Sequence, residues 1–347
     1  MSTGTLSLFF PVFVPACAAG LAYAGHRAMY LDWKTLLLYF FTGPGRTSRI
    51  ILLVFAALNL KSLPLGWTAR VFHSFLFHML GARPKTLPQR ALFHYAVTSS
   101  RTSLLETDYN IHKSNSTYFA DLDVSRSHLV THLLAPGMPI VGNNQKNKLV
   151  LDKDGNPVKG SFGIALGAVF CSFRREIGPL QGYEMWSRIL CWDRKWLYIV
   201  THFVVKGKVK PTSWHGKWKG PTRSKVVLKE GGGEDEVPDW TKYIHATAVS
   251  KYVFKLGRFT VHPSIMIHAS GLLPERPGGW RGGDEEEDCG EMVDLGPVDV
   301  EAEWDWKKVE AERRKGLEYA KHFGALDGTN SLFDGGEDGA IGKFPVG

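Results

Sequence analysis

The sequence predicts an α+β domain in which a mostly antiparallel sheet packs on one long helix. A run rich in apolar and aromatic residues at positions 92–99 precedes a long helical stretch at 115–134, which Pro136 and Gly137 end. Further runs rich in aromatic or β-branched residues follow, at positions 163–175, 183–191, 197–206 and 252–262, and a short turn at 192–195 joins the runs at 183–191 and 197–206. One strand, one helix and then strands in succession are typical of this class.

The composition is that of a folded protein from a reducing compartment. The chain has 347 residues, of which 44% are hydrophobic and 22% are charged, so it can bury a sizeable core. Its four cysteines are isolated in the sequence, at Cys17, Cys171, Cys191 and Cys289. Because neither C-x-x-C spacing nor a Cys/His cluster occurs, we expect neither a disulfide scaffold nor a structural zinc site.

Charge is divided unevenly along the chain. Residues 1–229 carry 29 basic and 10 acidic side chains, a net +19, whereas residues 230–347 carry 13 basic and 24 acidic, a net −11. A basic body with an acidic tail suits nucleic acid, an anionic membrane surface or an anionic ligand such as coenzyme A. Composition does not choose among these partners.

Residues 1–30 are predicted to form a transmembrane anchor. Residues 1–26 carry no Asp, Glu, Lys or Arg, and residues 5–25 are apolar enough to cross a hydrocarbon layer of about 30 Å as a helix. The alternative is a signal peptide cleaved near residues 22–24, but its basic n-region is missing. Basic residues after the segment place the rest of the chain in the cytosol. We therefore expect a single-pass protein of the endoplasmic reticulum or another endomembrane.

Residues 31–88 are predicted to form an interfacial helical region. The apolar run at 50–60 is too short to span a bilayer and indicates a buried or interfacial helix. At 71–80, apolar side chains recur at helical spacing, with Arg70, His73 and His78 among them. This pattern is typical of an amphipathic helix on a membrane, and equally of a helix that faces a protein core.

The folded domain is expected over residues 89–263, with polar insertions at 138–160 and 207–242. The second insertion interleaves lysines with Trp214 and Trp218, which fits coenzyme A phosphates, an anionic bilayer or single-stranded nucleic acid. Because no nucleic-acid-binding motif accompanies it, we expect a solvated loop and no nucleic acid partner.

The remaining residues, 264–347, are predicted to form an acidic linker and a charged C-terminal helix. The linker is rich in Gly and Pro and carries the acidic run 284–288. The helix is expected on the surface at 300–323, where Glu303 with Lys307 and Glu310 with Arg314 form i,i+4 pairs.

The most informative segment is residues 106–118, between the first predicted strand and the long helix. An acid, a histidine and an asparagine lie within ten residues there. A carboxylate just before a helix start can face a carbonyl that is polarised by the free backbone N–H groups of the first turn. That geometry stabilises an oxyanion beside a base or nucleophile. The simpler alternative is that Asp108 and Asn115 cap the helix.

This segment resembles the motif D-x-D-x-x-x-H-x-N-N-x-x-Y of hotdog-fold acyl-CoA thioesterases of the 4-hydroxybenzoyl-CoA thioesterase type. The corresponding residues are, in order, Glu106, Asp108, His112, Ser114, Asn115 and Tyr118. Glu106 stands where the motif has Asp, and Ser114 where it has Asn. Residues 118–126, 173–175 and 189–198 are similar to stretches of the membrane-anchored thioesterase superfamily member six group and its fungal relatives.

The resemblance implies a hotdog fold, in which an antiparallel sheet wraps one long helix, and a homodimer with active sites at its interface. It implies that Asp108 is the catalytic carboxylate, as nucleophile or general base, and that His112 and Asn115 shape the site. It places substrate binding around the helix start, at Ser114, Ser116, Thr117 and Tyr118. Asp121 and Asp123 are expected to be structural, in an ion pair such as one with Arg126.

We therefore expect a membrane-anchored thioesterase that hydrolyses an acyl-CoA or carrier-bound acyl thioester with water, using neither a metal nor a cofactor. The changes at Glu106 and Ser114 leave a second function open, namely a catalytically weak hotdog protein that binds acyl groups or protein partners at a membrane. The sequon at residues 115–117 agrees with a cytosolic domain, because a glycan there would obstruct the helix start.

Overall fold

The computed structural model describes residues 25–81, 87–215, 239–280 and 304–333, together with residues 19, 20, 22, 23, 295 and 341. The chain forms two compact units, residues 1–60 and 61–347, and each is described by itself. Most of the predicted anchor, residues 1–18, 21 and 24, lies outside the described residues. Among the described residues, none of the helices has both the length and the apolar character needed to cross a membrane.

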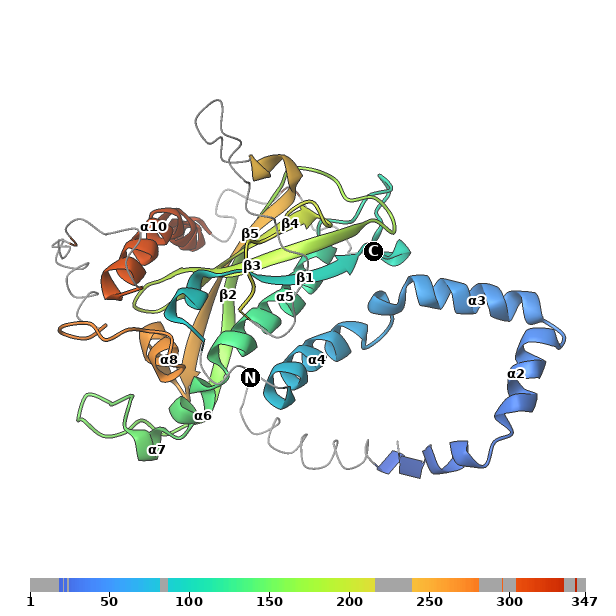
Figure 1. The fold of residues 1–347 in the computed structure, drawn as a ribbon, viewed down its shortest axis with the longest axis horizontal. Helices are drawn as coiled ribbons and strands as arrows, with labels where there is room; N and C mark the ends of the chain where they lie inside the picture. The colour runs from blue at the N-terminus through green and yellow to red at the C-terminus, as the bar shows by residue number, and fades with distance from the viewer. Residues whose placement is uncertain are drawn as a thin grey trace, which may run out of the picture. The chain divides into compact units, whose positions relative to one another are not determined.

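The first unit contains two short helices, α2 (Trp33–Thr42) and α3 (Arg46–Leu58), shown in blue in Figure 1. Asp32 begins α2 by accepting a hydrogen bond from Thr35 N, at 3.1 Å. Arg49 of α3 donates to the Tyr39 carbonyl near the end of α2, at 2.9 Å, and so joins the two helices. Neither helix has a buried residue, although most of their side chains are apolar. The helix expected at 50–60 is therefore present but not buried.

The second unit is built on a curled antiparallel sheet with the strand order β1-β3-β4-β5-β2, in which β6 pairs with β5 (Figure 1). The strands are β1 (Ala96–Arg101), β2 (Phe162–Phe173), β3 (Gly182–Trp192), β4 (Leu197–Val205), β5 (Ile244–Leu256) and β6 (Phe259–Val261). The tight turn expected between the third and fourth strands is formed around Asp193, whose Oδ1 accepts from the backbone of Lys195 and Trp196.

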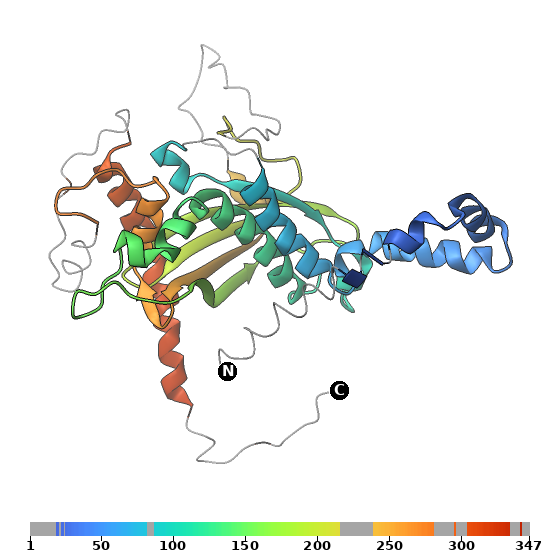
Figure 2. The same cartoon turned by 90° about the horizontal axis from the view of Figure 1, so that it is seen from below.

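One long helix, α5 (Thr117–Leu134), lies on one face of this sheet (Figure 2). Its leucines at 129 and 133 are buried in a cluster with Ile189 and Ile199 of the central strands. A buried hydroxyl pair also joins helix and sheet, because Ser125 Oγ lies 2.8 Å from Ser187 Oγ. The predicted arrangement of one strand, one helix and then strands is therefore confirmed.

Helix α4 (Gly66–Leu80) packs along α5. Ser74 is buried, and His78 Nε2 lies 3.0 Å from His128 Nδ1 of α5. Phe72 and Met79 on the remaining surface of α4 are exposed. Of the two alternatives for this segment, the helix that faces a protein core is thus observed for one side of α4.

Two strand boundaries differ from those expected. Residues Gln89–Phe93 form a 3-10 helix, η2, so the first strand begins at Ala96 rather than at 92. The run expected at 252–262 is two strands, because Gly257 adopts φ +58° and turns the chain between β5 and β6. β5 also starts earlier, at Ile244, directly after the short 3-10 helix η4 (Trp240–Tyr243).

The insertion at 138–160, expected to be a polar loop, is a packed element. It contains helices α6 (Gly137–Gly142) and α7 (Asn144–Asn147) and a turn closed by a bridge between Leu151 and Pro157. Asn144 is buried, and its side-chain amide donates to the carbonyls of Val150 and Val158. These hydrogen bonds satisfy backbone carbonyls on both sides of the turn, which is why the polar side chain of Asn144 can be buried. Of the second insertion, residues 216–238 lie outside the described residues.

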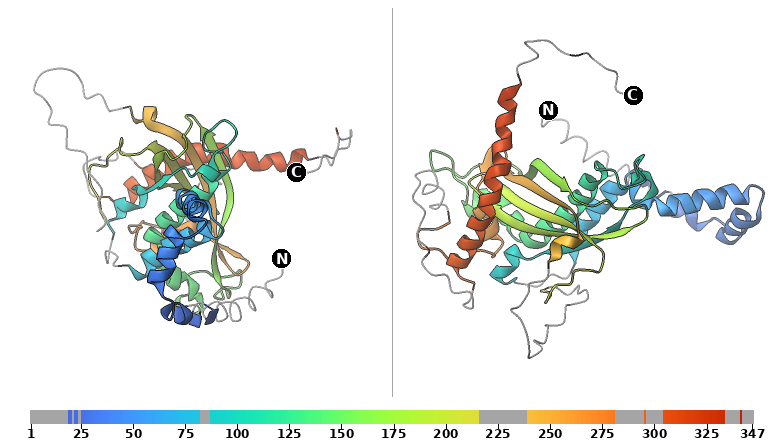
Figure 3. Two further views of the ribbon diagram at one scale, coloured as in Figure 1. Left: turned by 90° about the vertical axis from the view of Figure 1, so that its right-hand side faces the viewer. Right: turned by 90° about the horizontal axis from the view of Figure 1, so that it is seen from above.

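The C-terminal helix α10 (Trp306–Ala325) packs across the sheet face opposite α5, as Figure 3 shows in red. Gly316 permits this contact, because a Cβ there would lie 2.3 Å from the Leu190 carbonyl oxygen. Glu310 is buried and pairs with Arg314, as expected, and also with Arg313. The helix expected on the surface therefore buries one of its sides against the sheet. Glu303, the other acid of the expected pairs, lies outside the described residues. The shorter elements are α8 (Pro263–Ala269), which packs against α6, and η5 (Leu326–Leu332), which follows α10.

Candidate functional site

The predicted motif occupies the connection between β1 and α5. It begins with a 3-10 turn, η3 (Leu104–Glu106), closed by a capping box in which Ser103 N donates to Glu106 Oε2 at 3.0 Å. Thr107 then forms an antiparallel bridge with Lys113, so the residues between them make a short turn. Asp108 and His112 stand opposite each other at the neck of this turn, where Asp108 N donates to His112 O at 2.9 Å.

The Asp108 carboxylate is half-buried and fixed by its own turn. Its Oδ1 accepts from Asn110 N at 2.9 Å, while Ile111 closes the turn with a positive φ of +62°. No hydrogen-bond partner for Asp108 Oδ2 is found in the part of the chain that the structure describes. One oxygen is thus held and the other is available, which is the arrangement that a nucleophilic or basic carboxylate needs.

His112 makes a contact that the sequence did not predict. Its Nε2 lies 3.0 Å from Glu176 Oε2, on the loop that follows β2. Its Nδ1 is shielded from solvent and finds no hydrogen-bond partner among the described residues. Glu176 directly follows the Arg-Arg pair of the resemblance, and no signal in the sequence linked it to residue 112.

The helix start brings together the other predicted residues. Ser114 Oγ lies 3.1 Å from Ser116 Oγ, and Thr117 Oγ1 donates to the Ser114 carbonyl at 2.7 Å. The first position of α5 is Thr117 and its N-cap is Ser116, so the alternative in which Asp108 and Asn115 cap this helix is wrong. Within the described residues, no hydrogen bond from the backbone N–H of Asn115 or Ser116 is found. Two amides at the positive end of α5 are therefore free to polarise a carbonyl.

Tyr118 forms a wall beneath this helix start. Its ring is buried, with its centroid 4.8 Å from that of Phe203 and 5.0 Å from that of Phe173. Burial raises the pKa of the Tyr118 phenol well above its ordinary value, so the hydroxyl keeps its proton at neutral pH.

Beneath the motif lies a buried group of charged side chains, which we call the Asp121 cluster. Lys61 Nζ lies 3.0 Å and Lys113 Nζ 2.9 Å from Asp121 Oδ2, while Arg70 Nη2 lies 2.7 Å from Oδ1. Lys61 also lies 2.7 Å from Glu106 Oε2. Glu106, which replaces the motif's first Asp, thus has a structural partner in this protein. The cluster ties the motif to the segment before α4 and to α5 itself.

Asp121 remains ionised despite complete burial. Burial alone would raise the pKa of Asp121. The cations Lys113, Lys61 and Arg70 and a hydrogen bond from the Tyr183 hydroxyl lower it, and their combined effect is larger than that of burial. The net effect holds the pKa of Asp121 far below its ordinary value. The expected structural ion pairs are therefore present, since Asp121 pairs with Lys113, Lys61 and Arg70. Arg126 pairs with Asp123, at 2.6 Å, because Asp121 faces the opposite way toward three cations.

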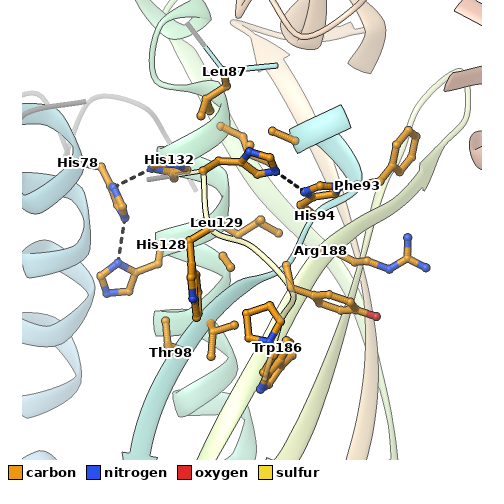
Figure 4. Close-up of a pocket in the computed structure, with 18 of the residues that line it drawn as sticks. His78, Leu87, Phe93, His94, Thr98, His128, Leu129, His132, Trp186 and Arg188 are labelled. Atoms are coloured by element: carbon orange, nitrogen blue, oxygen red, sulfur yellow. Dashed lines mark hydrogen bonds between the residues drawn. The ribbon is translucent and has the colours of Figure 1, made fainter. Parts of the chain in front are cut away.

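A second candidate site lies toward the other end of α5, and we call it the histidine pocket (Figure 4). Its volume is about 720 Å³, within the range of roughly 300–1,000 Å³ that is typical of small-molecule sites. His78 of α4 and His128 and His132 of α5 line one side, and Trp186 and Arg188 of β3 line another. Neither this pocket nor the motif offers a metal site: the described residues contain no group of three or more His, Cys, Asp or Glu side chains that could hold a metal ion.

Comparison with known proteins places this geometry in a family. A model of the thioesterase-like superfamily matches residues 103–223, which contain the whole motif. The chain is 34% identical over 304 residues to the "Probable thioesterase atnL" of Emericella nidulans, covering 84% of this chain and 89% of that protein. The chain belongs to the thioesterase-like superfamily. It is also 34% identical over 303 residues to the "Thioesterase poxG" of Penicillium oxalicum, covering 83% and 88% of the two chains.

Membership of the thioesterase-like superfamily confirms the expected hotdog fold and the expected family of thioester hydrolases. Among solved structures, the chain is similar to the YbaW probable thioesterase from Escherichia coli, with a TM-score of 0.33 and 9% identity over 51% of this chain and 96% of that one. The roles predicted for Asp108, His112 and Asn115, and for the substrate-binding residues Ser114 to Tyr118, remain predictions.

Proposed function

We propose that this protein hydrolyses an acyl thioester carried by coenzyme A or by a carrier protein. The observation that carries the proposal is the Asp108 carboxylate, fixed through Oδ1 by its own turn just before α5, in a chain whose relatives are thioesterases. The products would be a carboxylic acid and a free thiol.

In the proposed reaction Asp108 acts on the thioester carbonyl directly or through water. As a general base it takes one proton from water, whose oxygen bonds to the carbonyl carbon while the C–S bond breaks and the sulfur leaves with a proton. As a nucleophile it forms an anhydride with release of the thiol, and water then hydrolyses that anhydride. On either route, negative charge develops on the carbonyl oxygen, where the amides of Asn115 and Ser116 at the start of α5 would stabilise it. Tyr118 would form the wall against which the acyl group lies.

The replacement of Asp108 by Asn tests this assignment. Asn keeps an acceptor oxygen for the Asn110 amide but can neither attack nor take a proton, so we expect turnover of an acyl-CoA to fall about 10²- to 10⁴-fold. Asp152→Asn is a matched control, because Asp152 Oδ1 accepts from Asp154 N in a similar turn remote from the motif. Full activity in Asp108→Asn would reject the role.

A second candidate function is that of a catalytically weak hotdog protein that binds acyl groups or partners. It is favoured by Glu106 and Ser114, which depart from the motif, and by the burial of Glu106 in ion pairs with Lys61 and Lys113. A series of acyl-CoAs of increasing chain length distinguishes the two functions. Binding without turnover across the whole series would support the second.

We also propose that the protein is attached to a membrane, faces the cytosol and forms a homodimer. Residues 1–26 carry no Asp, Glu, Lys or Arg, and the apolar side chains of α2 and α3 are exposed, as with Leu37 at 55% and Leu52 at 67%. Flotation of the full chain with vesicles, before and after deletion of residues 1–30, tests the attachment. Recovery of the full chain in the lipid-free fraction would contradict it.

A further inference from the structure

The histidine pocket has the chemistry of a binding site for a small organic anion. We propose that it binds an apolar or aromatic molecule carrying one anionic group, a carboxylate in particular, with the anion held by Arg188 and the His94–His215 pair. This site is separate from the motif: His128 lies eleven residues after the start of α5, about 16 Å along the helix at 1.5 Å per residue. The site itself does not depend on the proposed function.

The walls of the pocket are suited to an apolar body. Aromatic and aliphatic side chains come from four separate parts of the chain, namely Phe77 of α4, Phe93 of η2, Leu129 of α5 and Trp214 of the segment after β4. Such walls bury most of a small ligand's surface, while a few polar groups fix its orientation.

The titratable side chains that line the described part of the pocket are mainly basic. Among the described residues that line it there is one arginine and five histidines, but neither an aspartate nor a glutamate. Arg188 Nε is buried, and no hydrogen-bond partner for it is found among the described residues; the guanidinium lies 5.6 Å from the Tyr95 ring. Glu184, four residues earlier on β3, accepts instead from Trp186 Nε1 and Gly207 N. A carboxylate is the group that matches the fork of a guanidinium such as that of Arg188.

The His94–His215 pair would respond to such an anion. Their ring nitrogens Nδ1 and Nε2 lie 2.6 Å apart, so one ring donates to the other. Burial, together with the nearby His215, Arg90 and Arg188, lowers the pKa of His94 to about 4. Burial and Arg90 also lower the pKa of His215. Both rings are therefore neutral at pH 7, and a bound anion would raise their pKa values again. Binding should then take up protons and strengthen as the pH falls.

The chemical class of the ligand connects this site with the proposed reaction. Hydrolysis of an acyl thioester releases a carboxylic acid with an apolar body, which is the kind of molecule that the pocket fits. On the proposed function, the pocket would therefore hold the product acid, away from the motif.

Calorimetric titration of the full chain tests the site, with decanoate, decane-1-sulfonate and decan-1-ol as probes. We expect both anions to bind at least tenfold more tightly than the alcohol. Arg188→Gln should weaken anion binding about tenfold and Arg188→Lys less, since Lys keeps the charge without the fork. Arg258→Gln, on the exposed turn between β5 and β6, is the matched control and should leave binding unchanged. Equal binding of anion and alcohol, or unchanged binding by Arg188→Gln, would overturn the proposal.

Two further measurements keep the test independent of how the variants fold and of catalysis. The sulfonate does not titrate between pH 5.5 and 7.5, so any proton taken up on binding goes to the protein. The number of these protons follows from the binding enthalpies measured in buffers that differ in ionisation enthalpy. Absence of uptake would count against the His94–His215 pair as part of the site. Asp108→Asn should bind both anions as the wild type does. If it does not, the anions occupy the motif and the pocket is not their site, whatever the outcome for thioester hydrolysis.

Discussion

The two ends of α5 carry opposite kinds of chemistry. At its first half, Asp121 is ionised in a buried cluster with Lys61, Arg70 and Lys113. At its second half, His128 and His132 line a pocket without carboxylates among the described lining residues.

This difference shows which end is rigid and which can adapt. Opposite charges in the Asp121 cluster neutralise one another, so any change that removes a partner leaves a buried charge unpaired. In the pocket, burial together with the nearby His73, His132 and Arg70 lowers the pKa of His128 to about 4, so the ring is neutral at pH 7. Neutral imidazoles tolerate an empty site and can gain a proton when an anion enters.

The largest effect is expected at the rigid end. Asp121→Asn leaves Lys61, Arg70 and Lys113 facing only Glu106, so the free energy of unfolding should fall by about 3–5 kcal/mol. Urea unfolding measures this change. Glu312→Gln removes an exposed ion pair with Lys315 and should cost less than about 1 kcal/mol. Equal losses in the two variants would show that the Asp121 cluster does not stabilise the fold.

The same cluster predicts how stability depends on acid. The pKa of Asp121 is lower in the folded chain than its ordinary value of 3.8, so the unfolded chain binds more protons near pH 4. Its stabilisation is present above that pH and is lost as the pH falls through the folded pKa. Urea midpoints between pH 7 and pH 3 should therefore fall less steeply in Asp121→Asn than in the wild type. Parallel curves would contradict this assignment.

A smaller effect is expected at the contact between His112 and Glu176. Glu176→Gln removes the charge from the exposed contact with His112. Exposed ion pairs contribute about 0.2–1 kcal/mol. If the contact orients His112 for the reaction, this corresponds to roughly a 1.5- to 5-fold loss in kcat. Steady-state kinetics with an acyl-CoA measures it, and Glu176→Asp should restore part of the loss. Glu318→Gln, on the exposed side of α10, is the control. A fall in thermal stability with unchanged kcat would assign Glu176 a structural role only.

An effect of the opposite sign, a gain in stability, is expected in the turn that holds Asp108. Ile111 has φ +62°, a left-handed conformation that costs a β-branched residue about 1–2 kcal/mol, and its side chain is 68% exposed. Ile111→Asn should raise the free energy of unfolding by about 1 kcal/mol, because Asn tolerates this conformation. Tyr109→Asn changes an exposed residue of the same turn that lacks a positive φ and should have little effect. A destabilised Ile111→Asn would indicate that the Ile111 side chain makes a contact worth more than the strain.

Much of the fold could be predicted because its signals are local. The helix at 117–134 and the hairpin around Asp193 follow from side-chain periodicity and turn residues within short windows. The start of the first strand, at Ala96, was predicted too early because Leu92 and Phe93 are apolar and buried in a 3-10 helix. A short apolar run has the same sequence pattern in a buried 3-10 helix as in a buried strand. The C-terminal helix was expected to be exposed because it is rich in charged residues. Two of these residues, Glu310 and Arg313, are buried as an ion pair, and the number of charges in a sequence does not reveal such pairing.

The sequence by itself determined the order of the elements, the place of the motif before the long helix, and the pairing of Glu310 with Arg314 one turn away. These depend on residues close together in the chain, whose spacing sets their geometry. Only the tertiary structure decided that Asp121 pairs with Lys61 and Arg70 rather than with Arg126, and that α4, η2 and β3 enclose the histidine pocket. The reason is physical: ion pairs and pockets between distant segments depend on how the sheet curls and how the helices pack on it, and the order of residues does not specify those distances.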